Sequence, residues 1–375
     1  MYKKYPQNAV RWKLPSVMIC IAIAVSILPV VALAGDNDEV SWVGDASPGD
    51  CEFQVFGNVE QIGYFTVEGL KKIAADLAET REYSWTNSSG ATGTDTFTGV
   101  CIEDFFSSIM KLNDHAGGMI VQAADGYRRV FSLDDVTSGA FWRDGDGNRM
   151  MLAWRGTASM DDRSIIDYDM PRIVVGRNGP DDANRSSWAT DVFNIWVTVF
   201  SDYSDFGRSV VFIEGLYNMG VVTGVNGSRF APEVGLSRAM FVTMLGRALN
   251  SEPELLDDAD GMFSDVDYAS WYGKYVEWAV NEGFVQGYSD GTFRPSGDLT
   301  VNHMLLMAER AGLVDVPEGI DSNANRPATR EEAAIVLYAL VAKAPYSWTE
   351  TVEDWLFEEP YSWTETEEDW LFEEG

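Results

Sequence analysis

The stretch FSDVDYASWYGKYVEWAVNEGFVQGYSDGTFRPSGDLTVNHMLLMAERAGL, residues 263–313, has a partial copy earlier in the chain. A shift of 63 residues places its first residue on Phe200, where the chain reads FSDY. Five further pairs then agree without a gap, and they are Gly220 with Gly283, Gly224 with Gly287, Phe230 with Phe293, Pro232 with Pro295, and Ser237 with Thr300. A constant offset of this kind indicates an internal structural repeat.

Each copy has the pattern of two helices joined by a loop. Tyr272, Val276 and Ala279 lie at helical spacing, and Gly283 supplies the left-handed residue that ends a first helix. Thr300 is a typical N-cap for a second helix. The second helix should bury Met304, Met307, Ala308 and Ala311, which correspond to Phe241, Met244, Leu245 and Ala248 in the earlier copy.

A third, shorter copy covers residues 325–342. Thr329 and Glu332 have the spacing of a capping box at the start of a helix. Too few residues separate Leu313 from Arg330 to hold a first helix and a loop, so this copy should contain a second helix only. Because one helical hairpin does not bury its apolar face alone, we expect the copies to pack together in one all-α bundle over residues 200–342.

These motifs resemble S-layer homology repeats. The resemblance rests on F-S-D-V, on Trp271, on G-Y-S-D-G-T-F-R-P and on the T-R-E-E of residues 329–332. It implies binding of the secondary polysaccharide of a Gram-positive-type cell wall, in grooves between the units. Carried over to this chain, the implied ligand residues are Arg238, Arg330, Trp271, Asp290 and Gly291. The second copy has Val301 where the family has its arginine, which leaves one or two competent grooves.

The chemistry of an acidic sugar suits an arginine at these positions. A guanidinium is a planar donor that binds a carboxylate through two hydrogen bonds. The alternative is that Arg238 and Arg330 are ordinary first-turn residues facing solvent. Trp271 has a similar alternative, since a tryptophan at this spacing also suits the core.

The N-terminal segment, residues 1–34, has the features of a secretory signal. Four basic residues lie in and around its start, an apolar run follows from Leu14 to Val31, and Ala32-Leu33-Ala34 matches a cleavage site. An uncleaved anchor is the alternative, because the apolar run reaches a membrane-spanning length. Residues 35–50 are polar and are expected to form a linker.

The charge of the chain excludes several classes of partner. Its 59 acidic residues against 27 lysines and arginines give a formal net charge of −32, so we expect no nucleic-acid partner and no binding to a membrane surface after cleavage. The expected partners are wall polysaccharide or peptidoglycan, with other S-layer proteins as a further class. Cys51 and Cys101 are the two cysteines after residue 34, and they are expected either to form a disulfide or to remain two buried thiols.

Residues 51–199 show short strands, helices and turns typical of a mixed α+β domain. A strand over 53–59, a helix over 67–78, a helix over 101–112 and a hairpin around Asp125-Gly126 are expected. The segment resembles the molybdopterin-binding domain of the sulfite oxidase family. The resemblance rests on FQVFGNV, FTGVCIEDFF, AADGYRRVFSLDDV, MLAWRG, PRIVVG and the N-I-W-V strand.

The ligand that holds molybdenum in that family is a cysteine thiolate, and it is missing here. The corresponding loop reads TNSSGATGTDTF and contains no cysteine, while Cys101 follows later. We therefore expect no cofactor and a domain without catalysis, displayed on the wall. The alternative is a molybdopterin-dependent oxidoreductase tethered to the wall.

The tail, residues 343–375, contains PYSWTETVEDWLFEE and then PYSWTETEEDWLFEE, copies that differ only at Val352 and Glu367. Its acidic composition is typical of a chain that is disordered in isolation, while its tryptophans favour a partner surface such as a sheet edge. A solvated duplication is the alternative. The sequence as a whole predicts an exported protein at the cell wall or S-layer surface.

Overall fold

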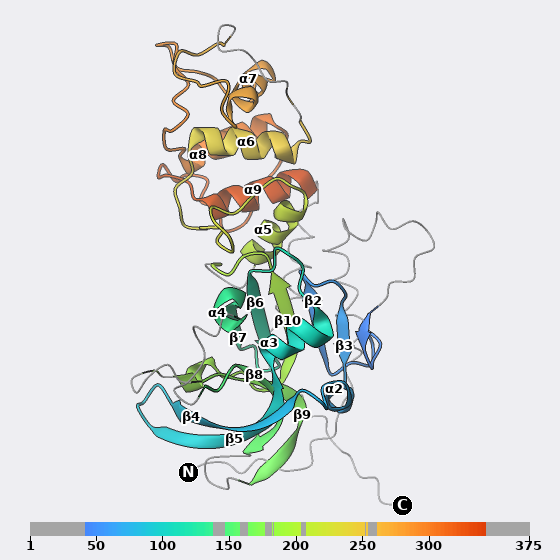
Figure 1. Cartoon of the computed structure of the whole chain (residues 1–375). Coiled ribbons are helices and arrows are strands. Elements are labelled where there is room, and N and C mark those ends of the chain that lie inside the picture. The colour runs from blue at the N-terminus through green and yellow to red at the C-terminus, as the bar shows by residue number, and fades with distance from the viewer. Residues whose placement is uncertain are drawn as a thin grey trace, which may run out of the picture.

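The computed structural model describes residues 42–137, 147–157, 164–176, 182, 184–203, 208–251, 253 and 261–342. The signal-like segment, residues 1–34, and the tail, residues 343–375, lie outside the described residues. Two parts follow each other along the chain: a lower part built on two sheets, and an upper part of helices joined by loops (Figure 1).

The first sheet has six strands in the order β1-β3-β2-β10-β6-β7. Their bounds are β1 Val43–Gly44, β2 Phe53–Gly57, β3 Gly63–Phe65, β6 Gly118–Ala123, β7 Arg128–Ser132 and β10 Val192–Thr198. The last strand, β10, lies inside the sheet, parallel to β2 and antiparallel to β6. The sheet therefore pairs strands from the two ends of the domain sequence, and both ends must be present for it to form.

The second sheet has four antiparallel strands in the order β4-β5-β8-β9. Their bounds are β4 Ala78–Thr86, β5 Thr92–Cys101, β8 Met151–Thr157 and β9 Ile165–Val174. The long β4–β5 hairpin curves around the lower end of the domain (Figure 1). Its turn is held by the Asn87 side chain, whose Oδ1 accepts hydrogen bonds from the backbone N–H groups of Ser89 and Ala91.

Helices cover the sheets, and here two sequence expectations were wrong. The bounds are α2 Val67–Ile73, α3 Ile102–Phe105, a π-helical turn Phe106–Met110 and α4 Leu133–Thr137. Thr66 caps α2, as its side chain accepts from the N–H of Gly69, but the helix stops at Ile73 because β4 already begins at Ala78. The expected helix over 101–112 is likewise a short α-helix and then a wider turn. The hairpin at Asp125-Gly126 is confirmed, since β6 pairs with β7.

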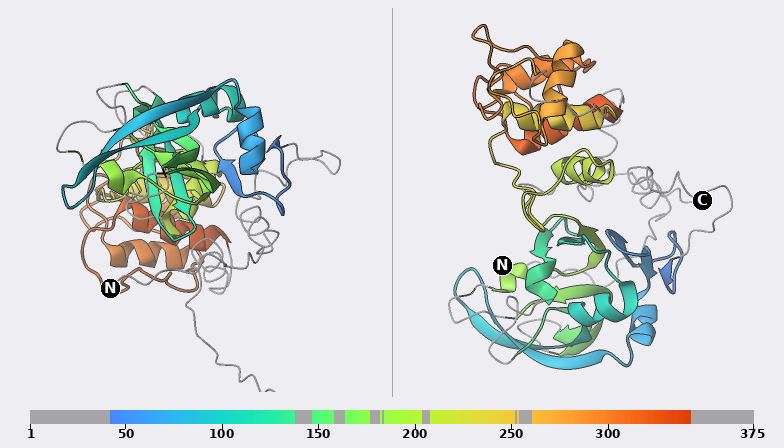
Figure 2. Two further views of the ribbon diagram at one scale, coloured as in Figure 1. Left: turned by 90° about the horizontal axis from the view of Figure 1, so that it is seen from below. Right: turned by 45° about the horizontal axis from the view of Figure 1, so that its top comes forward.

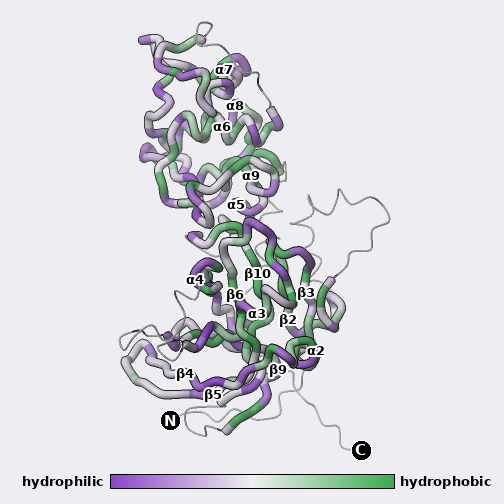
Figure 3. Tube along the Cα trace, viewed as in Figure 1, coloured by the Kyte–Doolittle hydropathy of each residue, from purple (hydrophilic) through white to green (hydrophobic). Residues whose placement is uncertain are grey.

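The core of the domain lies between the two sheets and their helices. Strands β2, β6 and β10 run as apolar stretches through the middle of the domain, whereas polar residues gather along β4 and β5 (Figure 3). The buried residues include Phe53, Phe65, Phe105, Met119 and Ile195, all at 1% exposure or less. Burial on this scale makes the lower part a domain with its own core.

The upper part continues directly from β10. Val199 and Phe200 follow the strand and already pack in the core of the helical part. Its helices are α5 Arg208–Asn218, α6 Arg238–Ala248, α7 Gly273–Asn281, α8 Val301–Arg310 and α9 Arg330–Ala342. Figure 2 shows α5 between the sheet domain and the remaining helices. The two parts therefore share a packed junction rather than a linker.

The helices follow the repeat that the sequence predicts. α5 and α6 belong to unit 1, α7 and α8 to unit 2, and α9 is the second helix of unit 3. Residues 311–329 are all described and contain no helix, so unit 3 lacks its first helix as expected. Ser237 and Thr300 cap α6 and α8 by accepting from the N–H groups three residues on. None of the described helices is long and apolar enough to cross a membrane.

The capping box of α9 gives a first testable prediction. The Thr329 Oγ1 accepts from the Glu332 N–H at 3.2 Å, and the Glu332 carboxylate accepts from the Thr329 N–H at 2.9 Å. Thr329→Ala should lower the free energy of unfolding by about 1 kcal/mol, because one helix N–H loses its acceptor. Urea unfolding measures this change, and Thr329→Ser should restore most of the loss. A Thr329→Ser variant no better than the alanine would contradict the capping role.

Candidate functional site

The three second helices begin at a closed ring of backbone hydrogen bonds. The Leu236 N–H donates to Ala328 O, the Ala328 N–H to Leu299 O, and the Leu299 N–H to Leu236 O, each at 2.8 Å. These residues precede α6, α9 and α8 by equal distances, so the ring has threefold pseudosymmetry. As a result, the start of each second helix lies against the loop of a neighbouring unit, which creates three equivalent boundaries.

Arg238 crosses the boundary between units 1 and 2, which we call the first groove. Its Nε donates to Phe293 O at 2.9 Å, and its Nη2 donates to Gln286 O at 3.0 Å. Arg238 is only 6% exposed, and this burial lowers the pKa of its guanidinium. Arg238 therefore does not face open solvent.

Arg330 makes the same contacts at the boundary between units 3 and 1, the second groove. Its Nε donates to Phe230 O at 3.0 Å and its Nη2 to Thr223 O at 2.8 Å. It is 7% exposed, and burial again lowers the pKa of its guanidinium. Both arginines thus join two units through backbone carbonyls.

The positive charge of these two arginines stays available for a ligand. Carbonyl oxygens satisfy Nε and Nη2 but do not neutralise the charge. Among the described residues, no carboxylate forms an ion pair with Arg238 or Arg330, and none accepts a hydrogen bond from their Nη1 atoms. The nearby carboxylates of Asp265 and Asp202 favour the charged forms of Arg238 and Arg330 but do not pair with them directly, which leaves both guanidinium groups able to bind a further anionic group.

The first groove adds two further side chains around Arg238. Two guanidinium groups lie near the Tyr288 ring, whose centroid is 5.2 Å from Arg238 Cζ and 3.9 Å from Arg294 Cζ. Tyr288 is 39% exposed, so one part of the ring remains accessible. A sugar ring stacks well on such an aromatic face while a guanidinium binds its acidic group.

The backbone that presents Arg294 is held in an unusual conformation. Arg294 has a φ of 59°, in the left-handed region that non-glycine residues seldom adopt. The Asp265 carboxylate stabilises it by accepting from the N–H groups of Phe293 and Arg294 at 2.7 and 2.8 Å. This explains the F-S-D motif physically: its aspartate folds the loop that carries the site.

Asp290 and Gly291, two of the predicted ligand residues, form the turn beside Arg294. Asp290 accepts from Thr292 and pairs with Arg294 Nη2 at 2.9 Å, and these hydrogen bonds lower the pKa of its carboxyl to about 2. Gly291 has a φ of 79°, as the turn requires. Asp290 is therefore placed as a counter-ion of Arg294, close to the site.

The second groove has the same scaffold with different side chains. Asp202 accepts from the N–H groups of Phe230 and Ala231 at 2.7 and 2.8 Å, as Asp265 does in unit 2. However, the positions of Tyr288, Asp290 and Arg294 hold Val225, Gly227 and Ala231. The second groove therefore lacks the aromatic ring and the second cation that the first groove has at these positions, although Arg229 in the same loop lies 3.6 Å from Asp202.

The third boundary, between units 2 and 3, lacks a guanidinium at the equivalent position. Val301 takes the place of the arginine and is fully buried. Its N–H donates to Arg326 O at 3.1 Å, and the Arg326 side chain pairs with Glu332 at 2.5 Å. At this boundary a buried apolar side chain takes the place of the buried guanidinium of the other two boundaries.

Trp271, another predicted ligand residue, is 55% exposed, so it does not belong to the core. Its ring meets Tyr272 edge-on, with 5.2 Å between the centroids. No ring contact joins it to Tyr288 within the part of the chain that the structure describes. The sequence interpretation in turn missed Tyr288 and Arg294, although both flank the Asp290-Gly291 turn inside GYSDGTFRP.

The two cysteines of the sheet domain are thiols, which is one of the two alternatives that the sequence left open. Cys101 is buried at the end of β5, and Cys51 is half-buried, with its Sγ donating to Pro48 O at 3.6 Å. The thiol alternative is therefore the one found, with only one of the two fully buried.

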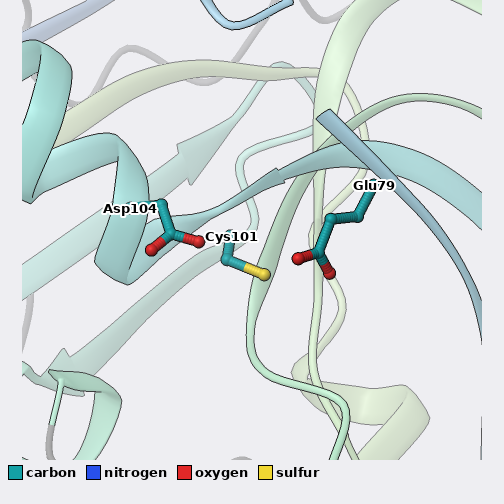
Figure 4. Close-up of side chains that lie close together, drawn as sticks. All are labelled: Glu79, Cys101 and Asp104. Carbon is teal, nitrogen blue, oxygen red and sulfur yellow. The ribbon is translucent and has the colours of Figure 1, made fainter. Parts of the chain in front are cut away.

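Cys101 also lies beside two carboxylates, and Figure 4 shows its Sγ between Glu79 and Asp104. Arg149 and Arg81 already pair with these carboxylates, since Arg149 lies 2.5 Å from Asp104 and Arg81 lies 2.6 Å from Glu79. Burial raises the pKa of the Cys101 thiol to about 11, so it is not a thiolate at neutral pH. The residues present do not fit a thiolate-bound molybdenum, and the turn at Asn87 contains no cysteine.

Comparisons with known proteins agree with the geometry of the helical part. The S-layer homology domain family matches residues 263–300. An endoglucanase of a Bacillus species is 33% identical over 112 residues, which cover 30% of this chain and 11% of the relative. A surface layer protein of Brevibacillus choshinensis is 28% identical over 100 residues, covering 26% and 9%.

A middle cell wall protein of Brevibacillus brevis is 28% identical over 109 residues, covering 29% of this chain and 10% of the relative. The chain thus spans about a tenth of the length of these three relatives. Two of their names place them at the cell surface. The chain therefore carries an S-layer homology domain and is a secreted protein of the cell-wall surface.

Proposed function

We propose that the chain attaches non-covalently to an acidic secondary cell-wall polysaccharide through the first groove, and displays its sheet domain as cargo. The observation that carries this proposal is the buried Arg238 guanidinium, which has no carboxylate partner among the described residues and lies beside Tyr288 and Arg294. An acidic sugar supplies the missing anion and a ring face to stack on Tyr288.

The second groove contributes less in this proposal. Arg330 offers one cation, but Val225 and Ala231 replace the aromatic ring and the second guanidinium. We therefore expect the first groove to dominate affinity. The relatives support an anchor of this kind, because proteins with names as different as endoglucanase and surface layer protein share a segment that is about a tenth of their length.

Co-sedimentation with purified cell walls tests the anchor. Arg294→Ala should weaken binding about tenfold to a hundredfold, because a charge-assisted hydrogen bond to the anion is lost. Arg155→Ala, which removes an exposed arginine on β8, should leave binding unchanged and controls for net charge. Walls stripped of their polymer should not retain the chain. Equal retention by stripped walls, or equal loss in both variants, would contradict the proposal.

A gain of function provides a matched test of the groove assignment. Val225→Tyr with Ala231→Arg rebuilds the aromatic and the second cation beside Arg330, and Ala231 already has the left-handed φ of 60° that Arg294 adopts. This double variant should strengthen wall binding and should restore binding to the Arg294→Ala chain.

For the sheet domain, we propose a sulfite oxidase-like fold without catalysis, as the motifs quoted above suggest. The loop of residues 86–97, which contains no cysteine, supports this proposal. The alternative is a molybdopterin-dependent oxidoreductase tethered to the wall. Metal analysis of purified protein separates the two, since stoichiometric molybdenum would favour the enzyme.

A further inference from the structure

The first helix of each complete unit covers the second helix of another unit. α7 of unit 2 packs on α6 of unit 1, where Tyr275 and Trp278 lie against Gly246. The contact is close: a Cβ at Gly246 would lie 2.4 Å from Tyr275 Cδ1. In the same way, α5 of unit 1 packs on α9 of unit 3, where the Tyr338 and Phe212 rings stack at 4.6 Å.

By the threefold pseudosymmetry, the missing first helix of unit 3 would cover α8. The corresponding face of α8 is exposed at His303, Leu306 and Glu309. On α6 the residue equivalent to Leu306 is Thr243, and it is 2% exposed, whereas Leu306 is 42% exposed. Two more apolar side chains follow α8 in the open, Val314 at 90% and Val316 at 39% exposure.

We propose that residues 345–359, the first copy of the duplicated tail, pack as a helix on this face of α8 and complete unit 3. Trp348, Val352, Trp355 and Leu356 lie at i, i+4, i+7 and i+8, which forms one apolar stripe of a helix. The remaining face of the segment is acidic, and His303 and Arg310 on α8 are basic, although Glu309 lies between them.

The position of the tail in the sequence favours packing within its own chain. It follows α9, which packs against α8, and a helix of 15 residues spans about 22 Å, enough to cover α8. The three exposed apolar side chains on and after α8, Leu306, Val314 and Val316, cannot provide the roughly 800 Å² per partner of a stable interface between two chains. A tethered segment needs less, because its effective concentration reaches about the millimolar range.

The second copy of the tail provides a natural control. Its stripe is interrupted, since Glu367 stands where the first copy has Val352, and this is the one difference between the copies. Only the first copy therefore presents a continuous apolar face. In this proposal, Val352 gives the first copy its ability to pack on α8, and the second copy lacks that ability because Glu367 replaces the valine.

Amide hydrogen exchange of the full chain tests the proposal. Residues 345–359 should exchange at least about tenfold more slowly than residues 360–374, and Val352→Glu should abolish this difference. Leu306→Glu, on the opposite side of the contact, should abolish it too. The matched variant Glu367→Val should leave the protection of the first copy in place. None of these surface changes threatens the core.

Four results would overturn the proposal, and three of them are patterns of exchange at one protein concentration. Both copies may exchange at the same rate in the unmodified chain, protection may persist in Val352→Glu, or protection may map to an edge strand such as β7 instead of α8. Dilution distinguishes the tail of the same chain from the tail of a second chain as the segment that covers α8. Protection within one chain does not depend on protein concentration, whereas protection by a second chain does. Loss of protection on dilution would therefore also contradict it.

Discussion

Arg238→Ala should lower the free energy of unfolding by about 3 kcal/mol and abolish wall binding. The substitution leaves Phe293 O and Gln286 O without their donor at the boundary between units 1 and 2. A hydrogen bond to a charged donor contributes about 1.5–3 kcal/mol, and a buried acceptor left alone costs more than the bond itself. Urea unfolding gives the stability, and co-sedimentation with walls gives the binding.

Arg238→Lys is the informative partner of that variant. Lysine keeps the positive charge but has a single terminal nitrogen, so it cannot reach both carbonyls with the geometry of a planar fork. We expect it to recover less than half of the lost stability. A lysine variant as stable as the unmodified chain would show that charge, and not the fork, is what matters at this boundary.

The separation of structure from binding depends on Arg294. Arg294 is half exposed and pairs with Asp290, so its removal should have little effect on stability while it weakens wall binding. Arg238→Ala should affect both. If Arg294→Ala proved as destabilising as Arg238→Ala, the loss of wall binding would report unfolding of the loop rather than loss of a ligand contact.

The second large effect concerns Glu214, which lies at the junction of the two parts. Its carboxyl is 8% exposed, accepts from the Val199 N–H at 3.0 and 3.1 Å, and also accepts from the Tyr203 hydroxyl. Burial raises the pKa of this carboxyl from 4.5 to about 7. The protonated form is therefore favoured in the folded state.

The sign of the pH dependence follows from that pKa. Glu214 contributes stability that is fully present below pH 4.5 and is lost as the pH rises through about 7. The shift corresponds to roughly 3 kcal/mol of unfolding free energy. Glu214→Gln should remove this dependence, so the difference in stability between the variant and the unmodified chain should change between pH 4.5 and 7 and be constant above about pH 8.

Urea unfolding at several pH values measures this difference. Glu233→Gln, a change at an exposed carboxylate before α6, is the matched control for the loss of one carboxylate. Taking differences is necessary because Glu332 acts in the opposite direction: burial alone would raise its pKa, but hydrogen bonds from Arg326 and Thr329 lower it. A flat difference for Glu214→Gln would contradict the assignment.

The junction has a consequence for how the cargo is held. Because Val199 and Phe200 lie in the helical core while β10 lies inside the first sheet, the sheet domain and the anchor are continuous through one strand. For the proposed attachment, this continuity would restrain the orientation of the sheet domain relative to the helical part.

The sequence by itself determined the local features of the anchor. A constant offset of 63 residues identified the units, Ser237, Thr300 and Thr329 identified the starts of their second helices, and the short interval before Arg330 showed that unit 3 has no first helix. These features depend on spacing and capping within a few residues, which is why they can be read without the fold.

Only the tertiary structure decided which residues meet. The ring of hydrogen bonds through Leu236, Leu299 and Ala328 joins segments from three units. Together with the hydrogen bond from the Arg238 N–H to Gly297 O, it places Arg238 against the loop of unit 2. In the sheet domain, long-range pairing gave β4 its length and stopped α2 early, against local helical propensity.

The residues of the proposed binding site show the same division. Arg238 was found from its motif, but the positions of Tyr288 and Arg294 on either side of one turn became meaningful only when the loop closed over Arg238. Trp271 illustrates the converse, because its motif position does not tell whether its ring faces the core or solvent. Spacing along the chain records which groups are available, while the packing of one unit on the next decides which of them share a groove.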